Sequence, residues 1–180
     1  LVIKDGGTIG VASDADAITI ASDGQVTFSQ PMTITTADNL TQLSLVSTDA
    51  DSNIGPRFDL IRNSTTPAAN DFLGQIRFMG EDAADNSLSY VSMFGQLLDA
   101  TDGGEDGSFE LDVRLAGSNR SRMISNATET VFNDDSIDLD FRVETNAEAN
   151  AFVIDAGAET ATFGVPVTAN DGISIDNITI

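Results

Sequence analysis

Acidic side chains concentrate in the segment DATDGGEDG at 99–107, which holds Asp99, Asp102, Glu105 and Asp106. Two carboxyl groups held across a cleft are the machinery of most glycosidases, and sugar clefts usually add aromatic platforms. The chain has no Trp and only one Tyr, so the second requirement is poorly met. We therefore expect this segment to be a solvated acidic turn without catalytic activity.

The same oxygen atoms could instead bind calcium, which prefers carboxylate and carbonyl ligands. The segment DADSNIG at 49–55 begins like an EF-hand loop, but its Gly comes one position late and Leu60 stands where the final Glu is needed. An EF-hand is therefore excluded, whereas a looser calcium site at 99–106, or between chains, stays as an alternative. We expect no catalytic, cofactor-binding or metal-ligating residues, no cofactor and no enzymatic function.

All seven Arg residues lie between positions 57 and 142, and Arg120 and Arg122 are the closest pair. Such a pair could bind phosphate or an anionic glycan. The other five Arg residues fall on or beside polar positions of predicted strands with acids nearby, so we expect cross-strand ion pairs instead. These five are Arg57, Arg62, Arg77, Arg114 and Arg142.

The composition excludes much of the remaining chemistry. The 180 residues include 22 Asp and 7 Glu against 8 basic side chains, giving a net charge of -21, with no His and no Cys. Imidazole bases, thiolate nucleophiles, zinc fingers and disulfides are therefore excluded. The charge opposes binding to nucleic acid or to anionic membranes, and no apolar run is long enough for membrane insertion.

Alternating polar and apolar residues predict β-strands along the whole chain. The clearest are FELDVRL at 109–115 and IDLDFRVE at 137–144. A hairpin is predicted at 17–28, and weaker strand patterns occur at 32–34, 40–47, 57–63, 74–80 and 87–98. One turn of helix is expected within 66–75, before Gly74. We expect an all-β fold of roughly ten or more short strands.

A repeat divides the chain into three predicted domains. The segment AITIASDGQVTFSQPMT at 17–33 aligns with AFVIDAGAETATFGVPVT at 151–168, and both end in F-x-x-P-x-T. Repeated hairpins that cannot form a core alone are typical of stacked arrays. We predict hairpin spacers at 1–39 and 144–180 that flank a central β domain at 40–143, within a longer polypeptide.

These segments resemble bacteriophage tail fibres and related virion appendages. The run FNDDSIDLDFRVETNAEANAFVIDAGAETATFGVPVTA at 132–169 resembles their spacer, as does ASDADAITIASDGQVTFSQPMTI at 12–34. The final GISIDNITI at 172–180 looks like the start of another spacer, and residues 57–124 resemble a β domain of such fibres.

The resemblance implies an elongated homotrimeric shaft, often followed by an intramolecular chaperone domain, with a β-sandwich-like or β-prism-like domain between hairpin spacers. It implies a structural virion protein, extracellular and contacting other tail proteins, that presents a tip for a host receptor or glycan bound elsewhere on the chain. A bacterial cell-surface adhesin or filament repeat is the alternative, followed by a polysaccharide-degrading tailspike. Apolar strands with too little bulk for a monomeric core could then bury their side chains between chains.

Overall fold

The computed structural model describes residue 4 and residues 6–167. It is all-β, with eleven strands and no helix among the described residues. The strands form three antiparallel sheets, and the chain divides into two compact units, 1–58 and 59–180. The all-β prediction is confirmed, whereas the predicted three-domain boundaries stay a prediction.

The first unit contains a three-stranded sheet in the order β1 (Thr8–Val11), β2 (Asp14–Ile20) and β3 (Val26–Phe28). A turn joins β2 to β3, where Gly24 adopts a φ of 88° and the Asp23 carboxylate accepts the backbone N–H of Gln25. Glycine adopts this left-handed conformation without steric cost, and aspartate accepts local backbone hydrogens in turns. The hairpin predicted at 17–28 is thus confirmed.

Residues 29–70 contain no strand, so the strands predicted at 32–34, 40–47 and 57–63 are wrong for the single chain. A strand needs a partner for its backbone groups, and the described residues supply none beside these segments. Their larger apolar side chains are exposed, among them Leu40, Leu43, Phe58 and Ile61. The alternating pattern of these segments is compatible with β-strands, but the segments do not form strands in the single chain.

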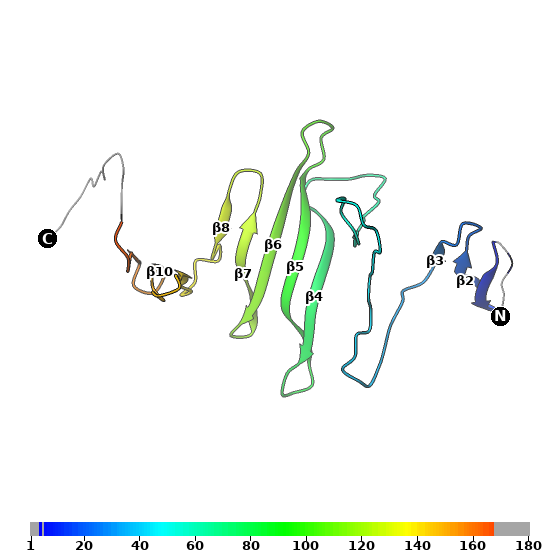
Figure 1. Cartoon of the computed structure of the whole chain (residues 1–180), viewed down its shortest axis with the longest axis horizontal. Coiled ribbons are helices and arrows are strands. Elements are labelled where there is room, and N and C mark those ends of the chain that lie inside the picture. The colour runs from blue at the N-terminus through cyan, green and yellow to red at the C-terminus, as the bar shows by residue number, and fades with distance from the viewer. Residues whose placement is uncertain (1–3, 5, 168–180) are drawn as a thin grey trace. The chain divides into compact units, whose positions relative to one another are not determined.

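The second unit contains a five-stranded sheet whose order follows the sequence (Figure 1). Its strands are β4 (Asp71–Glu81), β5 (Ser87–Asp99), β6 (Asp106–Leu115), β7 (Ser118–Ser125) and β8 (Thr130–Phe132). The predicted helical turn at 66–75 is wrong, because this segment instead leads into β4. The strands predicted at 74–80, 87–98 and 109–115 are confirmed within longer ones.

The hairpin between β6 and β7 has a two-residue loop, Ala116 and Gly117, with φ values of 48° and 85°. Positive φ at both loop positions matches the twist of the flanking strands. Alanine carries a Cβ that disfavours this conformation, so Ala116 is strained.

A second three-stranded sheet follows, with β9 (Phe141–Val143), β10 (Phe152–Asp155) and β11 (Thr160–Thr162). The β10–β11 hairpin corresponds to the β2–β3 hairpin of the sequence repeat, and Glu159 in its turn has a φ of 54°. The strand predicted at 137–144 is confirmed only at β9. The last residue of the repeat and the predicted strand start at 172–180 lie outside the described residues.

The described chain has almost no closed core. Ala151 is its one buried apolar residue, and Ser92 and Ser121 are its buried polar residues. Within residues 59–167, no second sheet packs face to face against the five-stranded sheet. The chain therefore supplies one layer of a structure that ordinarily needs two.

Candidate assembly surface

One face of the five-stranded sheet carries an apolar side chain from every strand at the same level. The register places Ile76 beside Met93, Met93 beside Leu111, and Leu111 beside Met123. Met123 in turn lies beside Phe132 on β8. Directly paired residues of antiparallel strands point to the same face, so these five side chains form one continuous line.

Aromatic rings extend this line into the next sheet. The ring centroids of Phe132 and Phe141 are 5.1 Å apart, those of Phe141 and Phe152 are 6.3 Å apart, and those of Phe152 and Phe163 are 4.9 Å apart. These separations are typical of favourable ring packing. We call the whole line the apolar row; its members are Ile76, Met93, Leu111, Met123, Phe132, Phe141, Phe152 and Phe163.

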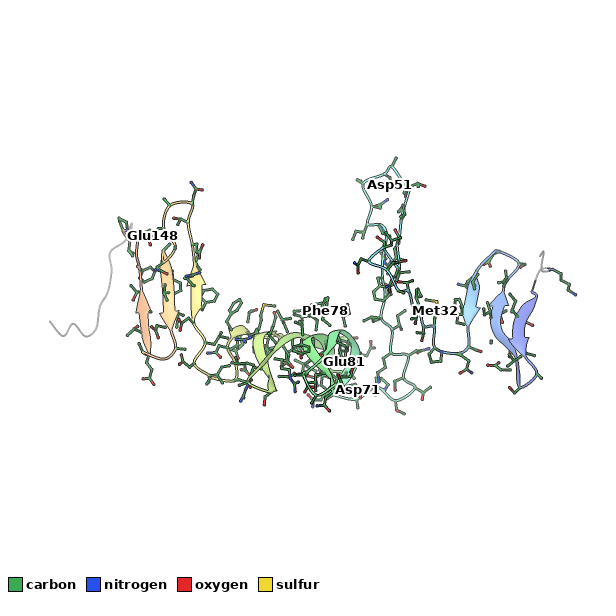
Figure 2. All side chains as sticks on the ribbon, turned by 90° about the horizontal axis from the view of Figure 1, so that it is seen from below. Met32, Asp51, Asp71, Phe78, Glu81 and Glu148 are labelled. Atoms are coloured by element: carbon green, nitrogen blue, oxygen red, sulfur yellow. The ribbon has the colours of Figure 1, made fainter. Side chains whose placement is uncertain are left out.

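On β4, β5 and β6, the neighbouring positions on this face are also uncharged, whereas Arg120 on β7 pairs with Val113 at its edge. Phe78, Val91 and Val113 form a second line beside the apolar row, and Phe109 lies on its other side. Figure 2 shows the sheet nearly edge-on, with side chains projecting from both faces. On β4, β5 and β6, no position between 74 and 80, 91 and 97, or 109 and 115 places a charged side chain on the apolar face.

This apolar face is open in the single chain. Ile76 is 41 % exposed, Phe78 is 58 % exposed and Phe132 is 52 % exposed. The Leu60 side chain covers this face at Gly74. A Cβ added to Gly74 would lie only 2.8 Å from the Leu60 Cβ. A contiguous exposed apolar surface of this kind marks a site of association.

The opposite face of the sheet carries the charged and polar side chains, together with Phe94 beside Gln75 and Ile124 beside Glu110. It carries Gln75 and Arg77 on β4, Ser92 on β5, and Glu110 and Asp112 on β6. Burial raises the pKa of Glu110 to about 7, and the neighbouring Asp112 carboxylate adds to the rise. Burial also raises the pKa of Asp112, against a hydrogen bond with Glu110 that lowers it. Two crowded carboxyl groups that resist joint ionisation behave in this way.

The structure does not bring the acids at 99–107 together into a site. The Asp99 carboxylate accepts the backbone N–H of Thr101 at 2.8 Å. The Thr101 side chain, followed by this backbone bond, holds the pKa of Asp99 below its ordinary value. At 49–55, the Asp51 carboxylate similarly accepts the backbone N–H of Asn53 at 2.8 Å. Among residues 6–167, no three acidic side chains group so that they could hold a metal ion. Both segments therefore use their carboxylates to shape turns, and calcium binding stays a prediction.

The arginines form ion pairs, but these do not cross between paired strands. Arg62 contacts Asp71 at 2.9 Å, and Arg142 of β9 contacts Glu144, the residue after this strand, at 2.6 Å. Arg120 lies 3.8 Å from Asp135, so it does not join Arg122 in an anion site. Arg114 instead donates to backbone and amide oxygens around the β6–β7 turn, including the carbonyl of Gly117.

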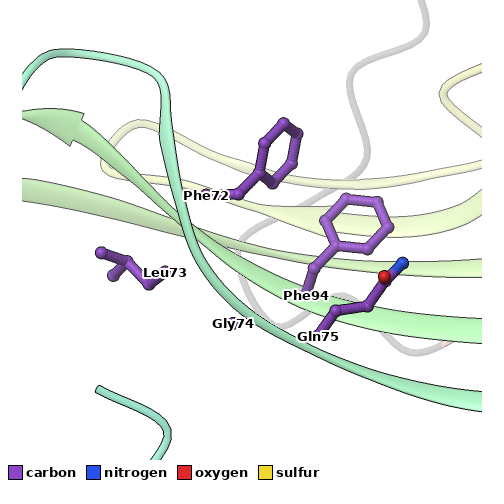
Figure 3. Close-up of a pocket in the computed structure, with 5 residues that line it drawn as sticks. All are labelled: Phe72, Leu73, Gly74, Gln75 and Phe94. Carbon is purple, nitrogen blue, oxygen red and sulfur yellow. The ribbon is translucent and has the colours of Figure 1, made fainter. Parts of the chain in front are cut away.

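One hollow lies beside an aromatic pair at the start of β4 (Figure 3). It has a volume of about 450 Å³ and is lined by Phe72, Leu73, Gly74, Gln75 and Phe94. The two phenylalanine rings meet edge to face at 5.5 Å. Its lining contains no ionisable side chain, so it offers no acid–base pair for a glycosidase.

Sequence reasoning missed the apolar row. It identified Phe109, Leu111, Phe141 and their alternating partners strand by strand, but not which strand positions lie level with one another. Four register shifts on the strand pairs, such as the one between Phe72 and Gly74, change which residues share a face. The recurrence of Phe in each C-terminal strand was the available signal.

Comparisons with known proteins add no identity to this geometry. The sequence matches no family model, and no curated protein or solved structure matches it. Within the described residues, no helix has the length and hydropathy needed to span a membrane. The conclusions on function therefore rest on the chain's own residues and on its open apolar face.

Proposed function

We propose that this chain is a structural segment of a homotrimeric bacteriophage tail fibre, in which hairpin spacers flank a prism-like β domain. Its role is mechanical: it extends the fibre and presents a host-binding tip that lies elsewhere in the polypeptide. In this proposal the protein is an extracellular virion component that contacts other tail proteins, carries no cofactor and catalyses no reaction.

The absence of a closed core in the described chain supports this proposal most strongly. The accessible surface is 14401 Å² for a chain of 18.9 kDa. A compact monomer of this mass exposes about 8,300 Å². The difference is about 6,000 Å², whereas an interface between two units of one chain buries roughly 600–1,500 Å². Packing between the two units is thus too small a source of burial, which supports burial against other chains.

The charge distribution agrees with a role in an extended assembly. The net charge of -21 is carried mainly by Asp in turns and on polar strand faces, where it keeps the outside of an assembly soluble. The sequence repeat places similar hairpins before and after the central sheet, as expected for spacers in a shaft.

Sedimentation equilibrium of the full-length polypeptide at micromolar concentration tests the proposal. We expect a mass of three chains that does not change on dilution within this range. A compact monomer would refute it. Labelled antibodies against residues 59–167 should then bind the fibres of intact virions in electron micrographs. Labelling of a bacterial cell surface instead would favour the adhesin alternative.

A polysaccharide-degrading tailspike is the remaining alternative. It requires two carboxyl groups across a sugar-binding cleft, whereas the Asp99 carboxylate caps a turn and the hollow beside Phe72 and Phe94 has no ionisable side chain in its lining. The trimeric protein should leave host capsular polysaccharide at its original chain length after prolonged incubation. Shortened products would establish the alternative.

A further inference from the structure

We propose that the apolar row and the uncharged sheet face around it form the interior of the assembly, packed against the same face of other copies of this chain. The inference rests on the proposed fibre function for the number of copies, three. It adds which surface is buried, which surface faces solvent, and which residues meet between copies.

The first argument is the contrast between the two faces of the five-stranded sheet. The apolar face carries large uncharged side chains on neighbouring strands, including the exposed Ile76 and Phe78. The polar face carries Arg77, Glu110 and Asp112. Burial of the polar face would remove charged groups from water, at a cost of several kcal/mol for each unpaired ion. The apolar face is therefore the one that gains by association.

The second argument identifies the occupant as another copy of the chain. Each chain has a net charge of -21, so copies repel one another wherever their acidic surfaces approach. The apolar face of β4, β5 and β6 is where copies can approach without bringing charges together, since positions 74–80, 91–97 and 109–115 place none there. The apolar faces of two copies also match each other, because every copy presents the same row of side chains.

The third argument is the area that is available. Obligate interfaces between identical chains bury about 2,000–5,000 Å² or more. The surplus surface of about 6,000 Å² per chain is enough for two such contacts per copy, as a closed ring of three requires. A small partner peptide would leave most of this surplus uncovered.

The row also extends the proposed interior beyond the five-stranded sheet. Phe141, Phe152 and Phe163 continue it across β9–β11, and Phe163 is exposed in the single chain. The sheet of β9–β11 would then contribute one ring in or beside each of its three strands to the same interior. Association thus joins the sheet and the spacer along one seam.

Neighbouring cysteine substitutions on β4 provide a matched test, because the chain has no native Cys. Ile76→Cys places a thiol on the apolar face, and Arg77→Cys places one on the polar face one residue later. Both positions are exposed in the single chain. In the assembled full-length protein, we expect Ile76→Cys to react with a maleimide at least ~10-fold more slowly than Arg77→Cys, because a buried thiol is inert. Equal rates after unfolding in urea serve as the control.

Native methionines give a second readout that needs no substitution. Met93 and Met123 belong to the apolar row, whereas Met79 lies at an exposed position of β4. In the assembled wild-type protein, dilute peroxide should oxidise Met79 first and leave Met93 and Met123 largely intact. Peptide mass spectrometry measures each site separately.

The outcomes separate this inference from the proposed function. Suppose that the mass is that of three chains, but Ile76→Cys reacts as fast as Arg77→Cys or Met93 is oxidised as fast as Met79. Such a result overturns the assigned interior and leaves the fibre proposal standing. A compact monomer overturns both. Protection of Ile76→Cys that requires a different added protein also overturns the inference, because the occupant would not be a copy of this chain.

Discussion

The carboxyl pair on the polar face predicts an unusual pH dependence of stability. Glu110 has its pKa raised from 4.5 to about 7, chiefly by burial, with Asp112 adding to the rise. Between these values the folded chain binds more protons at this site than the unfolded chain does. The free energy of unfolding should therefore fall as the pH rises from about 4.5 to about 7, and stay lower above pH 7.

The variant Glu110→Gln should remove most of this fall. A pKa change of this size at a fully buried site corresponds to roughly 3 kcal/mol. Glu110 is only half-buried, so solvent screening reduces the expected gain at pH 8 to about 1–2 kcal/mol. No gain is expected at pH 4, where the wild-type side chain is protonated in both states. A smaller fall should persist because the pKa of Asp112 is also raised.

Urea unfolding monitored by circular dichroism at pH 4, 6 and 8 measures these differences. The protein concentration must be held fixed, since the midpoint of an oligomer depends on it. Glu129→Gln removes the same charge from an exposed turn and controls for the general repulsion within a strongly acidic chain. An unchanged pH profile in Glu110→Gln, or an equal gain in Glu129→Gln, would refute the reasoning.

Four further substitutions test the backbone strain at Ala116 and the packing at other sites. Ala116→Asn should raise the free energy of unfolding by about 0.5–1 kcal/mol in urea titrations, because Asn tolerates the left-handed conformation before Gly117; a loss would contradict the strain. Gly74→Ala should lower it by about 1–3 kcal/mol, since the new Cβ would lie 2.8 Å from the Leu60 Cβ. Adding Leu60→Ala should restore part of that loss. Phe141→Ala should speed amide hydrogen exchange in β10 while β5 keeps its protection, and uniform acceleration would contradict a local role for this ring.

Alternation in the sequence was a sound guide where a partner strand lies nearby. The pattern FELDVRL forms the C-terminal part of β6, because β5 and β7 flank it through short connections. The equally regular IDLDFRVE formed only a three-residue strand. There the Asn133 side chain donates to the carbonyl of Ile137, and the Asp140 carboxylate accepts the N–H of Ala156. Such local bonds compete with strand pairing and are not visible in the polarity pattern.

The candidate surface was less accessible to sequence reasoning than the strands were. A strand's own period shows that Leu111 and Val113 share a face, but not that Leu111 lies level with Met93 and Met123. That level depends on loop lengths and on bulges such as the extra residue Arg122 on β7. The strand predicted at 40–47 is wrong for another reason. Its pattern predicts pairing with a neighbouring strand, and the described residues place no strand beside this segment.

The link between β8 and β9 has a mechanical consequence. No strand pairing joins the two sheets of the second unit, so tension along the chain would pass through residues 133–140. The Asn133 side chain shortens this link by holding the carbonyl of Ile137 at 2.8 Å, and the ring contact of Phe132 with Phe141 closes it. Under tension these few contacts would break before the strand pairs of β4–β7, because separating those strands requires many hydrogen bonds to break together. Eight released residues could extend to at most ~28 Å, giving the chain a short compliant joint.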